Sequence, residues 1–99
     1  MLNYRGETLE IVLLSDEELD SALCNITDNT KTSVQEIPMT TDGVLTNNVR
    51  FRYIALWDTT NFEPGEYTAV ITAIVDSKKT FGTAEITLGE PPILTLSVP

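Results

Sequence analysis

Apolar and polar side chains alternate with a repeat of two along the central part of this chain, from Asn48 to Leu88. One face of the first run carries Val49, Phe51, Tyr53, Ala55 and Trp57, and one face of the second carries Tyr67, Ala69, Ile71, Ala73 and Val75. This is the repeat of a β-strand, whose successive side chains point to opposite faces. Pro64-Gly65 lies between the runs and favours a turn, because proline fixes φ at about −65° and glycine accepts a positive φ. The pattern therefore predicts two strands, with Tyr67 near the start of the second.

The segment from Asp16 to Thr27 fits two structures. Ser15 and Glu18 match a helix capping box, and the apolar residues that follow have helical spacing: Leu19, Ala22, Leu23 and Ile26. As a strand from Asp20 to Thr27, the same segment would place Ala22, Cys24 and Ile26 on the core face. We favour the strand, because the flanking segments are strand-like and a short isolated helix is only marginally stable.

Three further segments have strand patterns. Glu7 to Ser15 carries Leu9, Ile11 and Leu13 on one face, and Thr80 to Leu88 carries Ala84, Ile86 and Leu88 inward. Thr32 to Met39 is a weaker strand, and its Pro38 suits a sheet edge or a strand end. Turn signals separate the strands at 28–31, at 41–44, where Asp42-Gly43 predicts a tight turn leading into Val44-Leu45, and at 76–79.

About seven short strands, with turn signals roughly every 8 to 12 residues, are typical of an antiparallel β-sandwich. We therefore expect an all-β fold. Residues 1–90 would form the sandwich, and residues 91–99 a C-terminal extension that begins with the stiff Pro91-Pro92 pair.

Composition excludes several functions. The 99 residues include 15 acidic and 6 basic side chains, and the resulting charge of −9 argues against a nucleic-acid partner. With no histidine and one cysteine, the chain can build neither a zinc cluster nor an intramolecular disulfide. The N-terminal residues lack a signal-peptide pattern, and no apolar run is long enough for a membrane span. We therefore expect a protein made in the cytoplasm, with no membrane partner, cofactor or metal.

Three groups of side chains are candidate sites, each with a plainer interpretation. The acidic run Asp16, Glu17, Glu18 and Asp20 has the oxygen ligands of Ca²⁺, but it lacks the glycine and ligand alternation of an EF-hand, which favours a solvated loop. Phe51, Tyr53 and Trp57 could stack on sugars, although their alternation with polar residues favours the core. Asp58 and Glu63 are a carboxylate pair near aromatic residues, but without histidine nothing completes a proton relay. We expect no catalytic residues.

The sequence Glu63-Pro64-Gly65-Glu66-Tyr67 resembles the corner of immunoglobulin-like domains. In those domains an acidic residue, a glycine and a tyrosine precede the strand that carries the second cysteine. The resemblance implies a structural corner at Glu63, Gly65 and Tyr67, with Ala69 at the cysteine position. It also implies that Cys24 faces Ala69 across the core.

The wider layout resembles the immunoglobulin-like domains of bacteriophage virion proteins, in particular the N-terminal domain of the phage baseplate upper protein family. Four segments carry the resemblance: 5–9 (Arg-Gly-Glu-Thr-Leu), 19–26, 63–67 and 81–88. It implies an immunoglobulin-like sandwich, a virion location, and a structural or attachment role without catalysis. The partners implied are other virion proteins, further copies of this chain, or both.

The C-terminal residues 93–98 alternate Ile93, Thr95 and Ser97 with Leu94, Leu96 and Val98, which predicts an extended strand with one apolar face. Pro91-Pro92 favours a stiff, extended approach over a tight hairpin. One interpretation is that this tail adds as a strand to a neighbouring subunit, with Ile93, Leu94, Leu96 and Val98 as its binding residues. The alternative is that it forms the last strand of its own sandwich.

Together these patterns predict a non-enzymatic docking protein of a phage virion. A carbohydrate-binding module that uses the aromatic residues near Trp57, with or without Ca²⁺, is the alternative.

Overall fold

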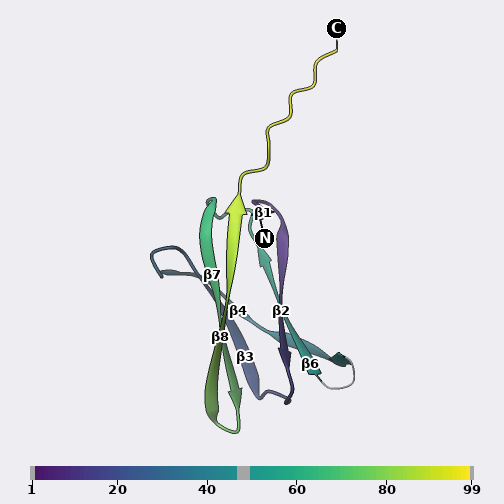
Figure 1. Cartoon of the computed structure of the whole chain (residues 1–99), viewed down its shortest axis with the longest axis vertical. Helices are drawn as coiled ribbons and strands as arrows, with labels where there is room; N and C mark the ends of the chain where they lie inside the picture. Colours follow the sequence, from purple (N-terminus) through teal and green to yellow (C-terminus); the bar gives the residue numbers. More distant parts are fainter. Residues whose placement is uncertain (1, 47–49, 99) are drawn as a thin grey trace.

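The computed structural model describes residues 2–46 and 50–98, and these residues form eight β-strands (Figure 1). In chain order the strands are β1 (Leu2–Tyr4), β2 (Thr8–Ser15), β3 (Ser21–Thr27), β4 (Ser33–Pro38), β5 (Thr40–Thr46), β6 (Arg50–Asp58), β7 (Gly65–Val75) and β8 (Lys78–Gly89). The all-β prediction is confirmed. The predicted strand from Asp20 to Thr27 is also confirmed, since it corresponds to β3.

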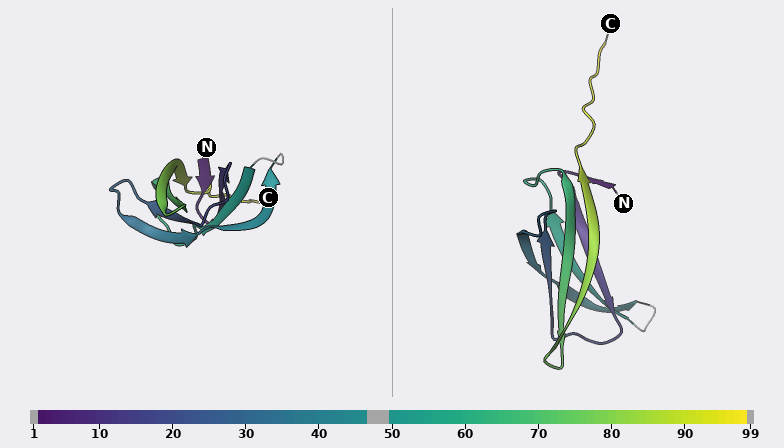
Figure 2. Two further views of the ribbon diagram at one scale, coloured as in Figure 1. Left: turned by 90° about the horizontal axis from the view of Figure 1, so that it is seen from below. Right: turned by 60° about the vertical axis from the view of Figure 1, so that its left-hand side comes forward.

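The strands belong to two sheets that curl around a common interior (Figure 2). The larger sheet has the order β1-β8-β7-β3-β4, and the smaller has the order β2-β6-β5. Strand β1 pairs parallel with β8, so the larger sheet is mixed rather than purely antiparallel as predicted. The result is a sandwich-like fold with five strands facing three.

The two sides of the sandwich, where an edge of one sheet comes close to an edge of the other, are built differently. On one side a single residue, Met39, connects β4 to β5, and its N–H donates to the carbonyl of Ala22 at 2.9 Å. The chain therefore passes directly from one sheet to the other there. On the opposite side the smaller sheet ends at β2. The larger sheet ends at the short β1, which pairs only with residues 87–89 of β8, so β8 forms the edge along the rest of its described length.

The core lies where β6 faces β3 and β7. The largest of the fully buried side chains are Trp57, Ile26, Leu88, Thr59 and Cys24. Alternate residues of β3 and β7 point into this core, because strand side chains alternate between faces. The predicted inward positions of these two strands are confirmed, as are those of Ile86 and Leu88 in β8.

One prediction about local structure is wrong. Asp42-Gly43 does not form a tight turn, because the chain runs through it within β5. There the pairing with β6 jumps from Thr41↔Tyr53 to Leu45↔Phe51, so that an irregularity absorbs the extra residues. Ala84 faces inward as predicted, opposite Ala69, but it is exposed, because the smaller sheet does not extend over it. The short strand β1 was not predicted, and Val49 lies outside the described residues.

The pairing of β3 with β7 corrects the expected position of Cys24. The two strands are hydrogen-bonded neighbours, with Cys24 opposite Ile71 and Ile26 opposite Ala69. Cys24 and Ala69 are therefore on the same face of one sheet, not across the core from each other. In the immunoglobulin arrangement the second strand and the penultimate strand lie in different sheets. The strand order here thus departs from that arrangement.

The buried thiol of Cys24 gives the first prediction. Cys24 is free and fully buried, and burial raises the pKa of its thiol, so the reactive thiolate is disfavoured. We expect the substitution Cys24→Ser to lower the free energy of unfolding by about 1 to 3 kcal/mol, because it buries a hydroxyl in an apolar site. Urea denaturation measures this.

In the native protein, a thiol reagent should label Cys24 far more slowly than a cysteine placed at the exposed Ser97. Equal labelling rates would contradict the buried position.

Candidate functional site

The C-terminal segment after β8 is the most exposed apolar part of the molecule. Residues 90–98 have no secondary structure, and in Figure 1 they extend away from the sandwich beyond the end of β8. The four predicted binding residues are almost fully exposed: Ile93 95%, Leu94 88%, Leu96 91% and Val98 84%. The segment from 91 to 98 also carries no charged side chain. We call residues 91–98 the tail.

The start of the tail is held firmly by the N-terminal part of the chain. The backbone N–H of Arg5 donates to the carbonyl of Gly89 at 2.8 Å, and Arg5 Nη1 lies 3.1 Å from Glu90 Oε1. Arg5 Nε donates in addition to the carbonyl of Thr60 at 3.3 Å. Arg5 thus holds the two residues that precede the tail, and Thr60 in turn positions the Arg5 side chain.

A tight return of the tail along its own β8 is blocked. Strand β1 already occupies the edge of β8 where such a hairpin would begin, with Leu2 opposite Thr87 and Tyr4 opposite Gly89. Pro91 and Pro92 follow directly, and proline has no N–H to donate to a hairpin ladder. In this structure the tail does not form the last strand of its own sandwich, which was the alternative interpretation.

The predicted corner is the connection between β6 and β7, where the chain crosses from the smaller sheet to the larger. The Tyr67 hydroxyl donates to the carbonyl of Glu63, and Gly65 has a φ of 155°, a conformation that favours glycine. The Tyr67 and Phe62 rings meet Trp57 edge to face, with ring centroids 5.2 Å and 5.1 Å away. Burial raises the pKa of Tyr67. The structure therefore brings the predicted corner residues together.

Thr59 is a residue of this crossing that sequence reasoning missed. Its side chain is fully buried, accepts from the N–H of Gly6 at 3.0 Å and donates to the carbonyl of Glu7 at 2.6 Å. Gly6 has a φ of 101°. Thr59 thus satisfies backbone groups of the turn that joins β1 to β2. No local pattern distinguishes it from the other threonines of the chain.

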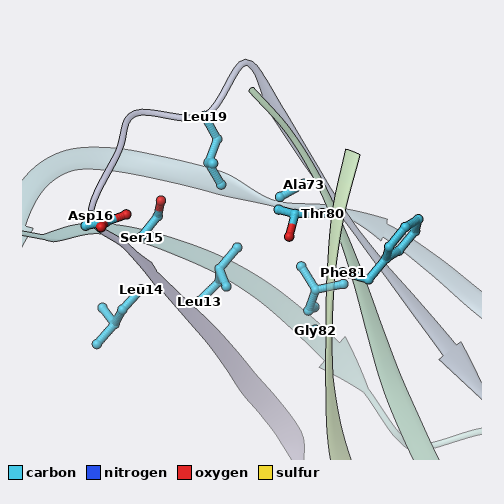
Figure 3. Close-up of a pocket in the computed structure, with 10 residues that line it drawn as sticks. Leu13, Leu14, Ser15, Asp16, Leu19, Ala73, Thr80, Phe81 and Gly82 are labelled. Atoms are coloured by element: carbon cyan, nitrogen blue, oxygen red, sulfur yellow. The ribbon is translucent and has the colours of Figure 1, made fainter. Parts of the chain in front are cut away.

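A groove of about 410 Å³ lies between β2 and the part of β8 that β1 does not cover (Figure 3). Its walls are the end of β2 and the start of β8, and Leu13 and Leu19 point into the space between them. The lining residues are Leu13, Leu14, Ser15, Asp16, Leu19, Ile71, Ala73, Thr80, Phe81 and Gly82. Phe81, at the rim, is 67% exposed. Sequence reasoning missed this groove, because it depends on which strands face each other.

The candidate sugar-stacking aromatics belong to the core. Trp57 is 1% exposed and Tyr53 is 5% exposed, and the Tyr53 hydroxyl accepts from the N–H of Leu19 at 2.8 Å. A second, smaller groove of about 320 Å³ lies beside Trp57, with Gln35, Asp58 and Asn61 among its lining residues. Trp57 Nε1 is buried and has no hydrogen-bond partner among the described residues. Trp57 therefore offers no open face for a sugar.

The acidic candidates do not converge on a metal. In residues 2–46 and 50–98, no three His, Cys, Asp or Glu side chains are placed to hold an ion. Asp20 instead accepts from the N–H of Asp76 at 3.1 Å. Asp58 accepts from the hydroxyl and the N–H of Thr60, which lowers its pKa, so it stays ionised and is poorly suited to act as a general acid. Glu63 is exposed beside Arg5.

Comparisons with protein-family models, curated proteins and solved structures find no match to this chain. Among the described residues there is no helix long and apolar enough to cross a membrane. Inference about function therefore depends on the tail, the corner and the two grooves.

The corner gives the second prediction. We expect Tyr67→Phe to lower the free energy of unfolding by about 0.5 to 1.5 kcal/mol, because it removes one hydrogen bond and leaves the Glu63 carbonyl without its donor. Chemical denaturation measures the change. Tyr4→Phe is the control, since Tyr4 is 38% exposed and should give an unchanged midpoint. Equal midpoints for both variants would mean that Tyr67 contributes by packing alone.

Proposed function

We propose that this chain is a non-enzymatic structural or attachment protein of a phage virion, which docks on other subunits by donating its tail as a β-strand. The observation that carries the docking proposal is the tail itself, an apolar, uncharged and nearly fully exposed segment with strand alternation. The proposed location is the virion, in a capsid, neck, baseplate or fibre.

A free segment of this kind has unsatisfied interactions of two types. Its backbone donors and acceptors have no strand partner within residues 2–46 and 50–98, and its large apolar side chains are exposed to water. Adding the tail to an exposed sheet edge would pair the backbone groups and bury alternate side chains in pockets. Each leucine that becomes fully buried would contribute about 1.5 to 3 kcal/mol. The tail therefore has the chemistry of a strand that completes another sheet.

The rigid start of the tail suits donation to another molecule. Arg5 and Pro91-Pro92 direct the tail away from its own sandwich, so little chain entropy remains to be lost at that point on binding. The charge of −9 disfavours contacts between the charged surfaces of acidic subunits, copies of this chain included, so the uncharged tail is the part best suited to make such a contact.

The virion and immunoglobulin-like parts of the proposal rest on the sequence resemblance at 5–9, 19–26, 63–67 and 81–88. The hydrogen bond from Tyr67 to Glu63 is consistent with the corner that this resemblance implies. The sandwich architecture is shared by many domains that differ in strand order. We therefore propose an immunoglobulin-like relative whose strand pairing has been rearranged.

The third prediction tests the docking role of the tail. We expect deletion of residues 91–99 to abolish association with the partner subunit while leaving the thermal unfolding midpoint unchanged, because the tail makes no strand pairing within the described chain. Co-purification with the other virion proteins and thermal denaturation measure the two effects.

A matched pair of point variants separates the two faces of the tail. Leu96→Asp should weaken association at least about tenfold, because it places a charge in an apolar pocket, whereas Ser97→Asp on the opposite face should change it little. Equal effects of the two substitutions, or a truncated protein that no longer folds, would refute strand donation.

Carbohydrate binding is the second candidate function, and one observation favours it. The groove beside Trp57 combines an aromatic wall with the polar side chains of Gln35, Asp58 and Asn61, a composition suited to a sugar hydroxyl. The groove is small, however, and Trp57 itself is buried.

The fourth prediction distinguishes the two functions. Trp57 is the only tryptophan, so the intrinsic fluorescence of the protein reports on this groove. If docking is the function, a panel of glycans, with and without Ca²⁺, should leave the emission unchanged. A saturable shift that Asn61→Ala removes would instead support carbohydrate binding.

A further inference from the structure

We propose that the tail of one copy inserts into the groove between β2 and β8 of a second copy, where it pairs with the free edge of β8. This inference rests on the proposed docking function and names the acceptor site. It makes the chain both donor and acceptor, so that copies join head to tail.

The edge of β8 is occupied along only part of its length. Strand β1 pairs with residues 87–89, whereas β8 begins at Lys78, and no other described strand pairs with this edge between 78 and 86. The opposite edge is fully paired with β7 from Gly65↔Leu88 to Val75↔Lys78. A row of backbone groups is therefore left without a strand partner beside the groove.

One hydrogen bond shows which residues of β8 direct their backbone groups to the open edge. The Gly89 carbonyl accepts from Arg5 at the β1 edge, and backbone groups of alternate strand residues point to the same edge. The N–H and C=O groups of Lys79, Phe81, Thr83 and Glu85 therefore point to the open edge. An edge of this kind is a template for another strand.

The side chains beside this edge leave room for large residues. The inward positions of β8 next to the groove are Thr80, Gly82 and Ala84, which are small, and a Cβ built at Gly82 would meet no atom within 4 Å. The far wall supplies Leu13 and Leu19, and the floor supplies Ile71 and Ala73. Small residues beside an apolar wall fit the alternate apolar residues Leu94, Leu96 and Val98 of the tail.

The tail matches the open edge in length and direction. The open segment from Lys79 to Glu85 and the tail from Ile93 to Val98 are of similar length, each roughly 20 Å at about 3.3 Å per residue. In Figure 1 the tail continues the direction of β8, so a second copy stacked beyond it in the same orientation would receive the tail parallel to its own β8. Strand β1 already pairs with β8 in this parallel sense, and the donated strand would extend the same ladder.

A copy cannot easily fill its own groove. The groove lies beside residues 80–82, near the start of β8, whereas the tail leaves from the end of β8 at Gly89. The tail would have to reverse at Pro91-Pro92 and pass β1, which covers the edge at 87–89. Donation between copies avoids both obstacles. Because donor and acceptor surfaces differ, such contacts form rings or open filaments rather than isologous dimers.

The test uses the purified full chain and crosslinking between single-cysteine variants. The native Cys24 is buried, so we expect it to react only slowly with the crosslinker. A Thr95→Cys protein is mixed with an affinity-tagged Thr83→Cys protein and treated with a short bis-maleimide. Both cysteines would lie on the outward face of the extended sheet, so a 95–83 product is expected. Val12→Cys on β2 and Glu36→Cys on β4 mark the other strand edges and should give little product.

A groove-filling variant completes the test. Gly82→Leu should weaken self-association in sedimentation measurements by about tenfold or more, because its side chain takes the space of a tail leucine. Thr83→Leu, which points outward, is the matched control and should not. If Gly82→Leu fails to fold, Ala84→Leu probes the same inward face.

The outcomes separate this inference from the proposed function. A 95–83 product that Gly82→Leu suppresses supports it. Dominant crosslinks to position 12 or 36, or a full chain that stays monomeric and gives no 95–83 product, overturns it. In the monomeric case the docking function stands if the tail is still needed for binding a different virion protein, and it falls if tail deletion leaves that binding intact.

Discussion

The burial of one face of β3 and β7 against β6 is the interaction on which the rest of this structure depends. Ile26, Trp57 and Ala69, which have almost no exposure, come from these three strands. Five strands face only three, so a part of the larger sheet has nothing to pack against. That mismatch leaves the inner face of β8 exposed at Ala84 and open at Gly82. The stable core and the open groove are thus two results of the same geometry.

The end of the molecule where the tail leaves is built with more polar contacts than the groove. Thr59 bridges the turn between β1 and β2, Tyr67 holds the crossing between the sheets, and Arg5 contacts both the crossing and the start of the tail. The hydrogen bonds of Thr59 and Arg5 link segments that are more than fifty residues apart in the sequence, whereas that of Tyr67 is local. The point at which the tail leaves is therefore held in place, which lowers the entropic cost of binding there.

Several elements were predictable because the signals for them are local. The alternation of Tyr67 to Val75 fixes its apolar face, Pro38 limits β4 to an edge, and Pro91-Pro92 ends the domain. The turn at Asp76 and Ser77 was also predicted, and both residues have positive φ, as a two-residue hairpin requires. Asp42-Gly43 failed as a turn signal, because pairing with β6 on both sides outweighs the local preference for a turn.

The sequence by itself determined that this chain forms strands, which face of most strands is apolar, that a turn precedes Tyr67, and that an apolar segment follows the last strand. These properties depend on residues a few positions apart. The tertiary structure alone decided that β3 lies beside β7, that β1 covers one end of β8, and that a groove stays open between β2 and β8. Alternation shows that a strand has an apolar face, but many partners could cover that face. The choice among them depends on packing between segments that are distant in the sequence.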